Sequence, residues 1–321
     1  MNREAVIRTH PIPTVHETNR TFPLEHSAPR RPNRWLTRYG LSLVLIVVCV
    51  VLMFPIVYTL ITSLQPRGYG QSRELFQQGI YLGHYEQLFA TPRFVRNLVN
   101  STVMSLGGAL VTTTLCALAG YAFARQRFAG RRWLLIGMLG LIMLPGIVNL
   151  IPLYRLSSEI LRAVPNNITV IADLSGRQAV NALIVIGVYG AFGIPFGVWV
   201  MKGFFDSIPR ELEEAAFVDG ASVMQALWRV ILPISLPGLV AVFLTNFVFN
   251  WNDFLTASVL IRTDELKTAT VGLLDFQNQL TGNNSEMLNA ASILIMLPGI
   301  AIFLLARGAF FRGYIDGAVK G

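Results

Sequence analysis

Six apolar runs, each close to the length needed to cross a bilayer, constrain this chain more than any other feature of its sequence. They lie at about 39–64, 97–123, 133–153, 181–201, 236–261 and 289–306. A membrane-spanning helix needs about 20 predominantly apolar residues. Because lipid offers no hydrogen-bond partners, each run must satisfy its own backbone and therefore forms a helix. The sequence predicts an all-α integral membrane protein with six transmembrane helices.

Prolines interrupt several of these runs. Pro145 and Pro152 lie in the third run, Pro195 in the fourth and Pro298 in the sixth. Proline removes a backbone hydrogen bond and kinks a helix. Two interpretations stay open: kinks that a packed bundle tolerates, or hinges in helices that move against one another.

The composition agrees with a membrane protein. Of the 321 residues, 53% are hydrophobic and 14% are charged, whereas a soluble domain has about 25% charged residues. The net charge is +8, but the arginines cluster beside the apolar runs as orientation signals, so we expect no nucleic-acid binding. Cys49 and Cys116 lie inside apolar runs and predict no disulfide framework. The histidines are scattered, so no metal site is expected.

Arginine placement predicts which loops face the cytoplasm. The N-terminal residues 1–38 are rich in arginine and proline, which is typical of a disordered tail. The loop after the second run carries Arg125, Arg127, Arg131 and Arg132 without an acid. The positive-inside rule places both segments in the cytoplasm.

Six spans then leave both termini inside, an N-in/C-in topology. The predicted organisation is a disordered cytoplasmic tail at 1–38, a transmembrane domain at 39–306 that includes a cytoplasmic hairpin at about 207–231, and a cytoplasmic tail at 307–321.

The hairpin between the fourth and fifth runs is polar and is not needed for spanning a bilayer. We expect Ser207 to cap its first helix and Pro209 to occupy the first turn. Asp219 and Gly220 predict the end of that helix, because glycine takes the left-handed conformation of a sharp reversal. The segment 222–225 is a capping box that starts a second helix.

Acidic residues distinguish this hairpin from one that lies on a membrane surface. An interfacial amphipathic helix carries Lys and Arg on its polar face. Here the polar residues are Glu211, Glu213, Glu214 and Asp219, which anionic lipid repels. The two alanines that follow Glu214 allow another backbone to approach closely. A basic or mixed protein groove is therefore the favoured partner.

The spacing in the hairpin resembles the coupling loop of ABC-importer permeases. The order is Glu-Ala-Ala, three residues, Gly220, nine residues, Val230, one residue and Leu-Pro. The one departure is Val230, where the pattern favours Ile. Further segments, 119–130 and 250–254, resemble carbohydrate-type permeases, and 317–321 is similar to the tail of maltose-type permease subunits that lack a large periplasmic domain.

The resemblance covers about 39–321 and implies a type I ABC importer permease fold in a bacterial or archaeal plasma membrane. It implies a heterodimer with a second permease subunit, two ATPase subunits and an extracytoplasmic solute-binding protein. The implied solute is a sugar, oligosaccharide or related polyol, and a non-sugar such as a glycerol phosphate ester is the alternative. The residues implied to couple to the ATPase are Glu213, Glu214, Ala215, Ala216, Asp219, Gly220 and Ala221.

The C-terminal tail is implied to insert between the ATPase subunits. The residues concerned are Asp316, Gly317, Val319, Lys320 and Gly321. A frayed terminus is the alternative interpretation.

A candidate solute path lies in the fifth run. Asn246, Asn250 and Asp253 share one helix face at i, i+4 and i+7. Amides and a carboxylate suit hydroxyl-rich solutes because they offer donors and acceptors. Trp251 and Asn252 lie on neighbouring faces, and Trp251 is a candidate for stacking on a sugar ring. The alternatives are interhelical packing, a place at the outer interface, or a solute held by the partner permease alone.

ATP hydrolysis is not expected in this chain. A phosphate-binding loop needs Gly-Lys before Ser or Thr, and none of Lys202, Lys267 and Lys320 follows glycine. ATP and Mg²⁺ are therefore expected in the partner ATPase, and we expect no enzyme activity, cofactor or metal here. A self-sufficient secondary carrier usually has acids within the membrane and an internal repeat. Asp253 is the only acid within a predicted span, and no clear repeat is visible.

Overall fold

The computed structural model describes residues 34–66, 79–165, 169–171, 174–279 and 285–318. The chain divides into two compact units, Met1–Pro55 and Ile56–Gly321, and each is described by itself. In the first unit, the described chain is the start of helix α1 (Arg34–Ser63), and its side chains from 39 to 55 are all exposed. An apolar helix that is exposed all round needs lipid or a partner protein.

Membrane-length helices dominate the described part of the chain. Four helices are long and apolar enough to cross a membrane: α1, α3 (Pro92–Arg125), α6 (Gly176–Ser207) and α13 (Ser285–Ala318). Two bent helix pairs raise the number to six if each pair is one span. The all-α expectation has one small exception, an antiparallel pair of strands, β1 (Thr169–Ile171) and β2 (Leu174–Ser175).

The third apolar run is not the single helix that the sequence predicts. Helix α4 (Arg131–Met143) ends before Pro145, and the 3₁₀ turn η2 (Gly146–Asn149) leads into α5 (Leu150–Ala163). The axes of the two parts differ by 95°. The reason is local: a residue before proline is pushed out of the helical region, and Leu144 is extended with ψ 126°.

The fifth run is also divided. Helix α10 (Leu236–Asn252) ends at Asp253, and a short helix α11 (Leu255–Leu260) follows. Before α10, the chain forms α8 (Val223–Ala226), the π-helical η3 (Leu227–Ile231) and α9 (Leu232–Ile234), bent from α10 by 76°.

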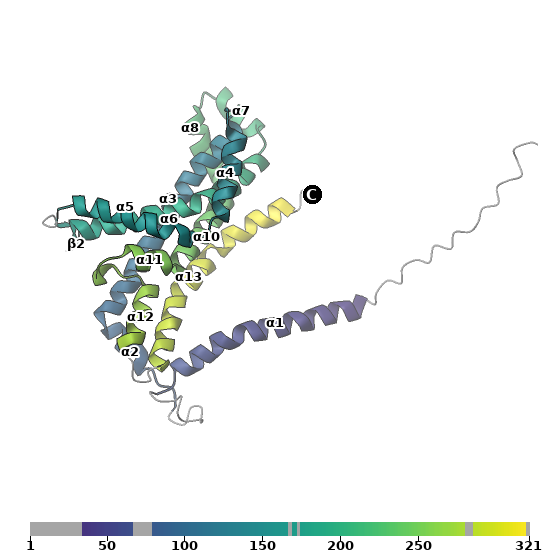
Figure 1. Cartoon of the computed structure of the whole chain (residues 1–321). Helices are drawn as coiled ribbons and strands as arrows, with labels where there is room; N and C mark the ends of the chain where they lie inside the picture. The colour runs from purple at the N-terminus through teal and green to yellow at the C-terminus, as the bar shows by residue number, and fades with distance from the viewer. Residues whose placement is uncertain (1–33, 67–78, 166–168, 172–173, 280–284, 319–321) are drawn as a thin grey trace, which may run out of the picture. The chain divides into compact units, whose positions relative to one another are not determined.

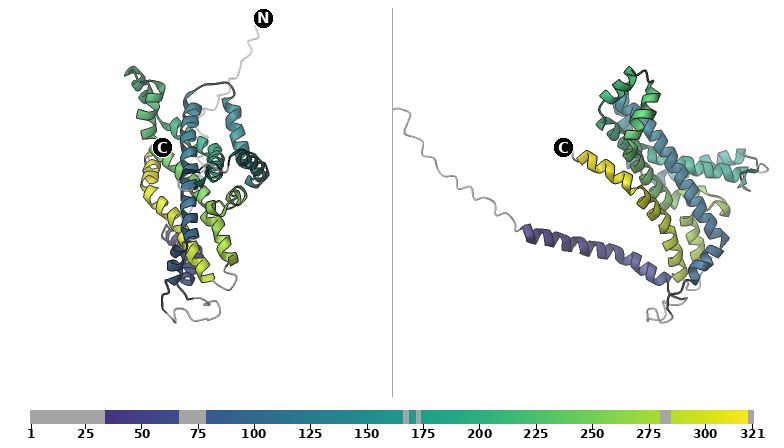
Figure 2. Two further views of the ribbon diagram at one scale, coloured as in Figure 1. Left: turned by 90° about the vertical axis from the view of Figure 1, so that its left-hand side faces the viewer. Right: turned by 180° about the vertical axis from the view of Figure 1, so that it is seen from behind.

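The remaining elements lie at the ends of the long helices. In Figures 1 and 2, α7 and α8 lie at one end of α3, whereas α2 and α12 lie at the other. Their bounds, with those of the 3₁₀ turn η4, are α2 (Gly83–Ala90), α7 (Glu211–Val218), η4 (Asp264–Leu266) and α12 (Ala269–Gln279).

Helices α3 and α6 form the centre of the second unit. They approach closely where glycine faces the partner helix: a Cβ on Gly120 would lie 2.7 Å from Cβ of Met201, and one on Gly197 would lie 2.5 Å from Sγ of Cys116. Thr112 also donates a hydrogen bond across the pair to the Gly190 carbonyl at 2.9 Å. Small residues thus allow the close packing that holds membrane helices together.

Candidate functional site

The polar hairpin begins further along the chain than the sequence indicates. Ser207 does not cap α7, because its hydroxyl donates to the Phe204 carbonyl within α6 at 2.7 Å. Helix α7 instead follows Arg210 without a side-chain cap. The physical reason is that Phe205 and Ile208 are buried in the core shared with α3, so α6 continues to Ser207.

The turn of the hairpin confirms its sequence signals. Gly220 has φ +82°, the left-handed conformation that favours glycine. The next amide, of Ala221, donates to the Ala216 carbonyl at 2.9 Å and closes the end of α7. Ser222 then caps α8: its hydroxyl accepts from the Gln225 amide, and the Gln225 side chain accepts from the Ser222 amide at 2.8 Å.

Glu213 does not belong to the exposed acidic face that the sequence predicts. It is 6% exposed, and its Oε2 lies 2.8 Å from Nε of Arg125 at the end of α3. The Tyr121 hydroxyl donates to its other carboxylate oxygen. Arg125 also donates from Nη2 to the Ile208 carbonyl at 2.9 Å. Glu213 therefore connects the hairpin to α3, and this role could not be predicted from the sequence alone.

The exposed face of the hairpin is mixed rather than simply acidic. Glu211, Glu214, Ala215, Asp219 and Gly220 are exposed, and Ala216 and Ala221 are half-buried. Large apolar side chains also face outward, and Val218 is 88% exposed. The sequence argument on the hairpin's partner weighed its charge and gave these residues no role in binding; they are Leu212, Phe217, Val218, Val223, Met224 and Trp228.

A second candidate site is a cavity of about 280 Å³ between α6 and α10. It brings together the three polar residues that the sequence placed on one face, Asn246, Asn250 and Asp253. Asn246 and Asn250 are 3% and 8% exposed. Their amides are also used in packing, since Asn246 Nδ2 donates to the Val242 carbonyl at 2.8 Å. The cavity wall is completed by Tyr189, Phe192, Gly193, Phe196, Phe249 and Thr256.

Asp253 both lines the cavity and separates α10 from α11. Its carboxylate accepts hydrogen bonds from the Tyr189 hydroxyl at 3.1 Å, from the Thr256 hydroxyl at 3.0 Å and from the Ala257 amide at 2.9 Å. It thereby satisfies donors at the start of α11, as a helix cap does. A carboxylate with neutral partners remains beside the cavity.

Trp251 and Asn252, which the sequence also assigned to the solute path, do not line this cavity. Trp251 is 3% exposed, and its indole Nε1 donates to the Ile295 carbonyl of α13 at 3.0 Å. Its ring stacks on Phe247 with centroids 5.7 Å apart. Asn252 is exposed and donates to the Val248 carbonyl at 2.8 Å. Trp251 is a core residue because its helix face points to α13.

Residues 117–315 match the family described as binding-protein-dependent transport system inner membrane component. The chain belongs to this family. It is thus a membrane permease and not an enzyme.

The relatives of this permease include carbohydrate transport proteins. The permease is 32% identical to the galactooligosaccharides transport system permease protein GanQ of Bacillus subtilis, over 91% of this chain and 98% of GanQ. It is 32% identical to the maltose/maltodextrin permease MalG of Yersinia pestis, over 84% of this chain and 89% of MalG. A solved bacterial importer of the polysaccharide alginate shares the fold, with TM-score 0.69, 20% identity, and 87% of this chain and 98% of that chain covered.

The sequence analysis did not identify the aromatic residues that line the cavity between α6 and α10. Tyr189, Phe192 and Phe196 come from α6, and Phe249 comes from α10. The signal was present in part, because 189, 192 and 196 recur at helical spacing. Such a pattern is equally typical of a packed helix face, so only the structure separates the two.

The C-terminal segment of the permease continues α13. Asp316 and Gly317 lie in this helix, which extends to Ala318. Val319, Lys320 and Gly321 lie outside the described residues. Their predicted contact with an ATPase stays a prediction.

Proposed function

We propose that the permease is the transmembrane subunit of an ATP-driven, binding-protein-dependent importer of a sugar, oligosaccharide or related polyol. It couples ATPase motion to alternating access through the hairpin. The observation that carries this proposal is the buried tie of Glu213 to Arg125 and Tyr121. This tie joins an exposed hairpin to a membrane-length helix, so a force on the hairpin reaches α3 through side chains held in one geometry.

In the proposed topology the bent pair α4–α5 is the third span and α10 is the fifth, which makes six spans with both termini in the cytoplasm. The support is that the ion pair brings the hairpin to the arginine-rich end of α3, the end that the positive-inside rule assigns to the cytoplasm. The partners are a second permease subunit in a heterodimer, two ATPase subunits that bind ATP and Mg²⁺, and an extracytoplasmic solute-binding protein. The membrane is a bacterial or archaeal plasma membrane.

The exposed apolar side chains of the hairpin support a protein partner. Phe217, Val218, Met224 and Trp228 are between 41% and 88% exposed. Exposed apolar clusters beside polar residues mark interaction sites. A cleft of the ATPase that takes Glu214, Ala215 and Gly220 would cover them.

The cavity between α6 and α10 supports a hydroxyl-rich solute. Its lining combines amides with aromatic rings, and it includes a carboxylate but no lysine or arginine. Amides donate and accept, whereas a phosphate ester would want a cation. This lining disfavours the glycerol phosphate alternative, and the names of the relatives agree with a carbohydrate.

We also propose that the C-terminal end of α13 and the residues that follow contact the ATPase. Deletion of 316–321 then reduces the transport rate more than it reduces copurification of the ATPase. Equal transport by the deletion variant would make this segment a frayed terminus.

Reconstitution tests the main proposal. Proteoliposomes that hold both permeases and the ATPase are given labelled maltooligosaccharide, its binding protein and internal ATP. We expect uptake that requires ATP and the binding protein. Uptake by the permease alone would establish a secondary carrier instead. A thermal-shift screen of the cognate binding protein against sugars, polyols and glycerol phosphate esters identifies the solute.

A further inference from the structure

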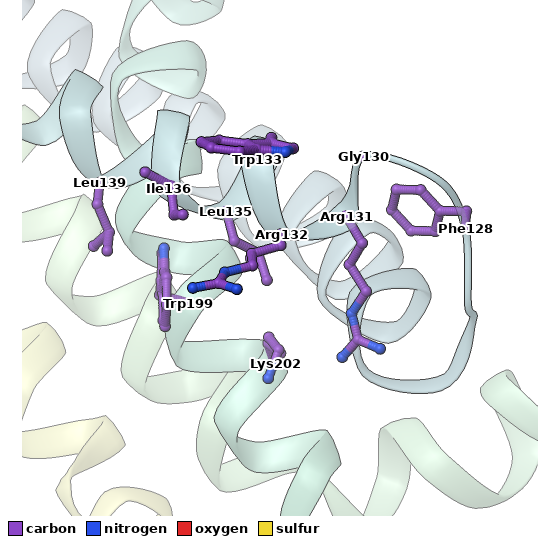
Figure 3. Close-up of a pocket in the computed structure, with 10 residues that line it drawn as sticks. All are labelled: Phe128, Gly130, Arg131, Arg132, Trp133, Leu135, Ile136, Leu139, Trp199 and Lys202. Carbon is purple, nitrogen blue, oxygen red and sulfur yellow. The ribbon is translucent and has the colours of Figure 1, made fainter.

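A second, larger cavity lies between the start of α4 and the last turns of α6. Its volume is about 780 Å³, and Figure 3 shows its lining residues. It is separate from the α6–α10 cavity and shares none of its residues. It is lined by Phe128, Gly130, Arg131, Arg132, Trp133, Leu135, Ile136, Leu139, Trp199 and Lys202.

The cavity is positively charged. Arg131, Arg132 and Lys202 line it, and no acid does. Lys202 is paired with Asp206, one turn further along α6, and Arg131 donates to the Gln126 carbonyl at 3.5 Å. Arg132 has no carboxylate within ion-pair distance among the residues that the structure describes. In Figure 3 it reaches from α4 towards Trp199 and Lys202.

An unused hydrogen-bond donor lies at the same place. Nε1 of Trp199 is buried and has no hydrogen-bond partner among the described residues. A buried N–H without an acceptor is unfavourable, and an indole can only donate. A ligand that pairs with this donor must therefore offer an acceptor oxygen, and the neighbouring cations favour one that carries negative charge.

The cavity is also apolar on one side. Leu135, Ile136 and Leu139 of α4 continue its wall, and Trp133 is 76% exposed at the start of α4. Tryptophan is common where a membrane meets water. A free anion or a nucleotide would leave this apolar wall uncovered, whereas a phospholipid would place its phosphate at the cations and its acyl chains along α4.

We propose that this cavity binds the phosphate of an anionic phospholipid. Arg132 and Lys202 hold the phosphate, Trp199 donates to one of its oxygens, and the acyl chains pack on α4. Basic pockets between membrane helices on the cytoplasmic side bind such headgroups. The lipid braces α4 against α6, close to the helix end that leads into the hairpin. This inference needs α4 and α6 to lie in a membrane, but it needs neither the proposed solute nor ATPase coupling.

The test uses the purified permease complex in zwitterionic detergent, with phosphatidylglycerol as the probe. We expect native mass spectrometry to detect bound phosphatidylglycerol and the melting temperature to rise with its addition, but not with phosphatidylcholine. Arg132→Gln should weaken binding about fivefold, since each cation near anionic lipid contributes about that factor. Trp199→Phe keeps an aromatic ring but removes the indole N–H donor. It should also weaken binding, but by less than Arg132→Gln does. The matched control is Arg127→Gln, which removes an arginine of the same loop outside the cavity and should leave binding unchanged.

Three results would overturn the proposal. Equal stabilisation by inorganic phosphate would assign the cavity to a free anion. Equal loss of lipid binding in Arg127→Gln and Arg132→Gln would reduce the effect to general surface charge. Loss of the ATPase from the Arg132→Gln complex, with phosphatidylglycerol binding unchanged, would make the cavity a protein contact.

Discussion

Each candidate site contains a tyrosine–carboxylate pair, and the two pairs differ in burial and charge: Glu213 is buried, whereas Asp253 is half-buried. At the hairpin, Glu213 accepts from Tyr121 and pairs with Arg125 at 2.8 Å. At the cavity, Asp253 accepts from Tyr189 at 3.1 Å and otherwise from neutral donors at the start of α11. The first pair joins α7 to α3, whereas the second separates α10 from α11.

The difference indicates what each carboxylate is for. A buried ion pair connects two segments in one specific geometry. Removing one of its partners leaves an uncompensated buried charge. Glu213 therefore suits the transmission of motion between rigid elements. Asp253 has no cation to neutralise it among the residues lining its cavity, so it can still accept hydrogen bonds from solute hydroxyls.

Arg125→Ala should have the largest effect of the variants considered. It leaves Glu213 buried without its cation, which costs about 3–5 kcal/mol. We expect the hairpin to detach from α3, the melting temperature of the complex to fall and the ATPase to be lost on purification. Arg127→Ala, an exposed neighbour, is the control. Equal behaviour of the two variants would show that the ion pair does not hold the hairpin.

The double variant Arg125→Met with Glu213→Leu separates charge from packing. Apolar replacement of a buried ion pair is often neutral or stabilising, so the melting temperature should recover. If transport recovers as well, the connection needs only packing. If transport stays low, the geometry of the ion pair is required for coupling.

Asp253→Asn should be milder and confined to the cavity. The amide places an NH₂ group where the carboxylate accepted from hydroxyl and amide donors, and an unsatisfied buried group costs about 1–3 kcal/mol. We expect a smaller fall in melting temperature than for Arg125→Ala, with the ATPase retained. Asp264→Asn removes an exposed acid that pairs with Lys267 and should change little. If Asp253→Asn lost the ATPase while Asp264→Asn kept it, the proposed difference in role between Glu213 and Asp253 would be contradicted.

The same contrast explains what could be predicted from the sequence. The apolar runs, the glycine turn at 220 and the capping box at 222–225 are local signals, and the structure contains each of them. The helix face that carries Asn246, Asn250 and Asp253 follows from periodicity alone, and these residues do meet in one cavity.

What sequence reasoning missed depends on contacts between distant segments. The sequence alone could not distinguish the buried Glu213 from the exposed Glu214, because Arg125, which pairs with Glu213, is far away in the chain. Trp251 looked available for a sugar ring because its partner on α13 was unknown. Pro145 was recognised as a kink and ends α4 for a local reason, but the 95° angle between α4 and α5 could not be predicted from a proline alone.

Gly220→Val tests the hairpin without touching either carboxylate. Nothing lies within 4 Å of a Cβ at this position, so the cost comes from φ +82° and is roughly 1–2 kcal/mol or more for a branched residue. We expect folded spans and reduced stimulation of ATPase activity by loaded binding protein. Gly220→Asn, which tolerates left-handed φ, should retain most of the stimulation. Normal transport by Gly220→Val would contradict a coupling role for the turn.

Asn250→Ala should have the smallest effect on stability and a specific effect on transport. The Asn250 amide lines the cavity, and within the described part of the chain its one hydrogen bond is a long one, 3.5 Å, to the Ser105 carbonyl. Loss of one hydrogen bond to solute is worth about 0.5–1.5 kcal/mol, which raises the KM for transport up to about tenfold. Asn252→Ala is the matched control, because Asn252 is exposed and does not line the cavity. A raised KM in Asn250→Ala, with basal ATPase activity and assembly intact, would place the solute against α10. Loss of assembly would instead assign Asn250 to packing against α3, and an unchanged KM would leave solute binding to the partner permease.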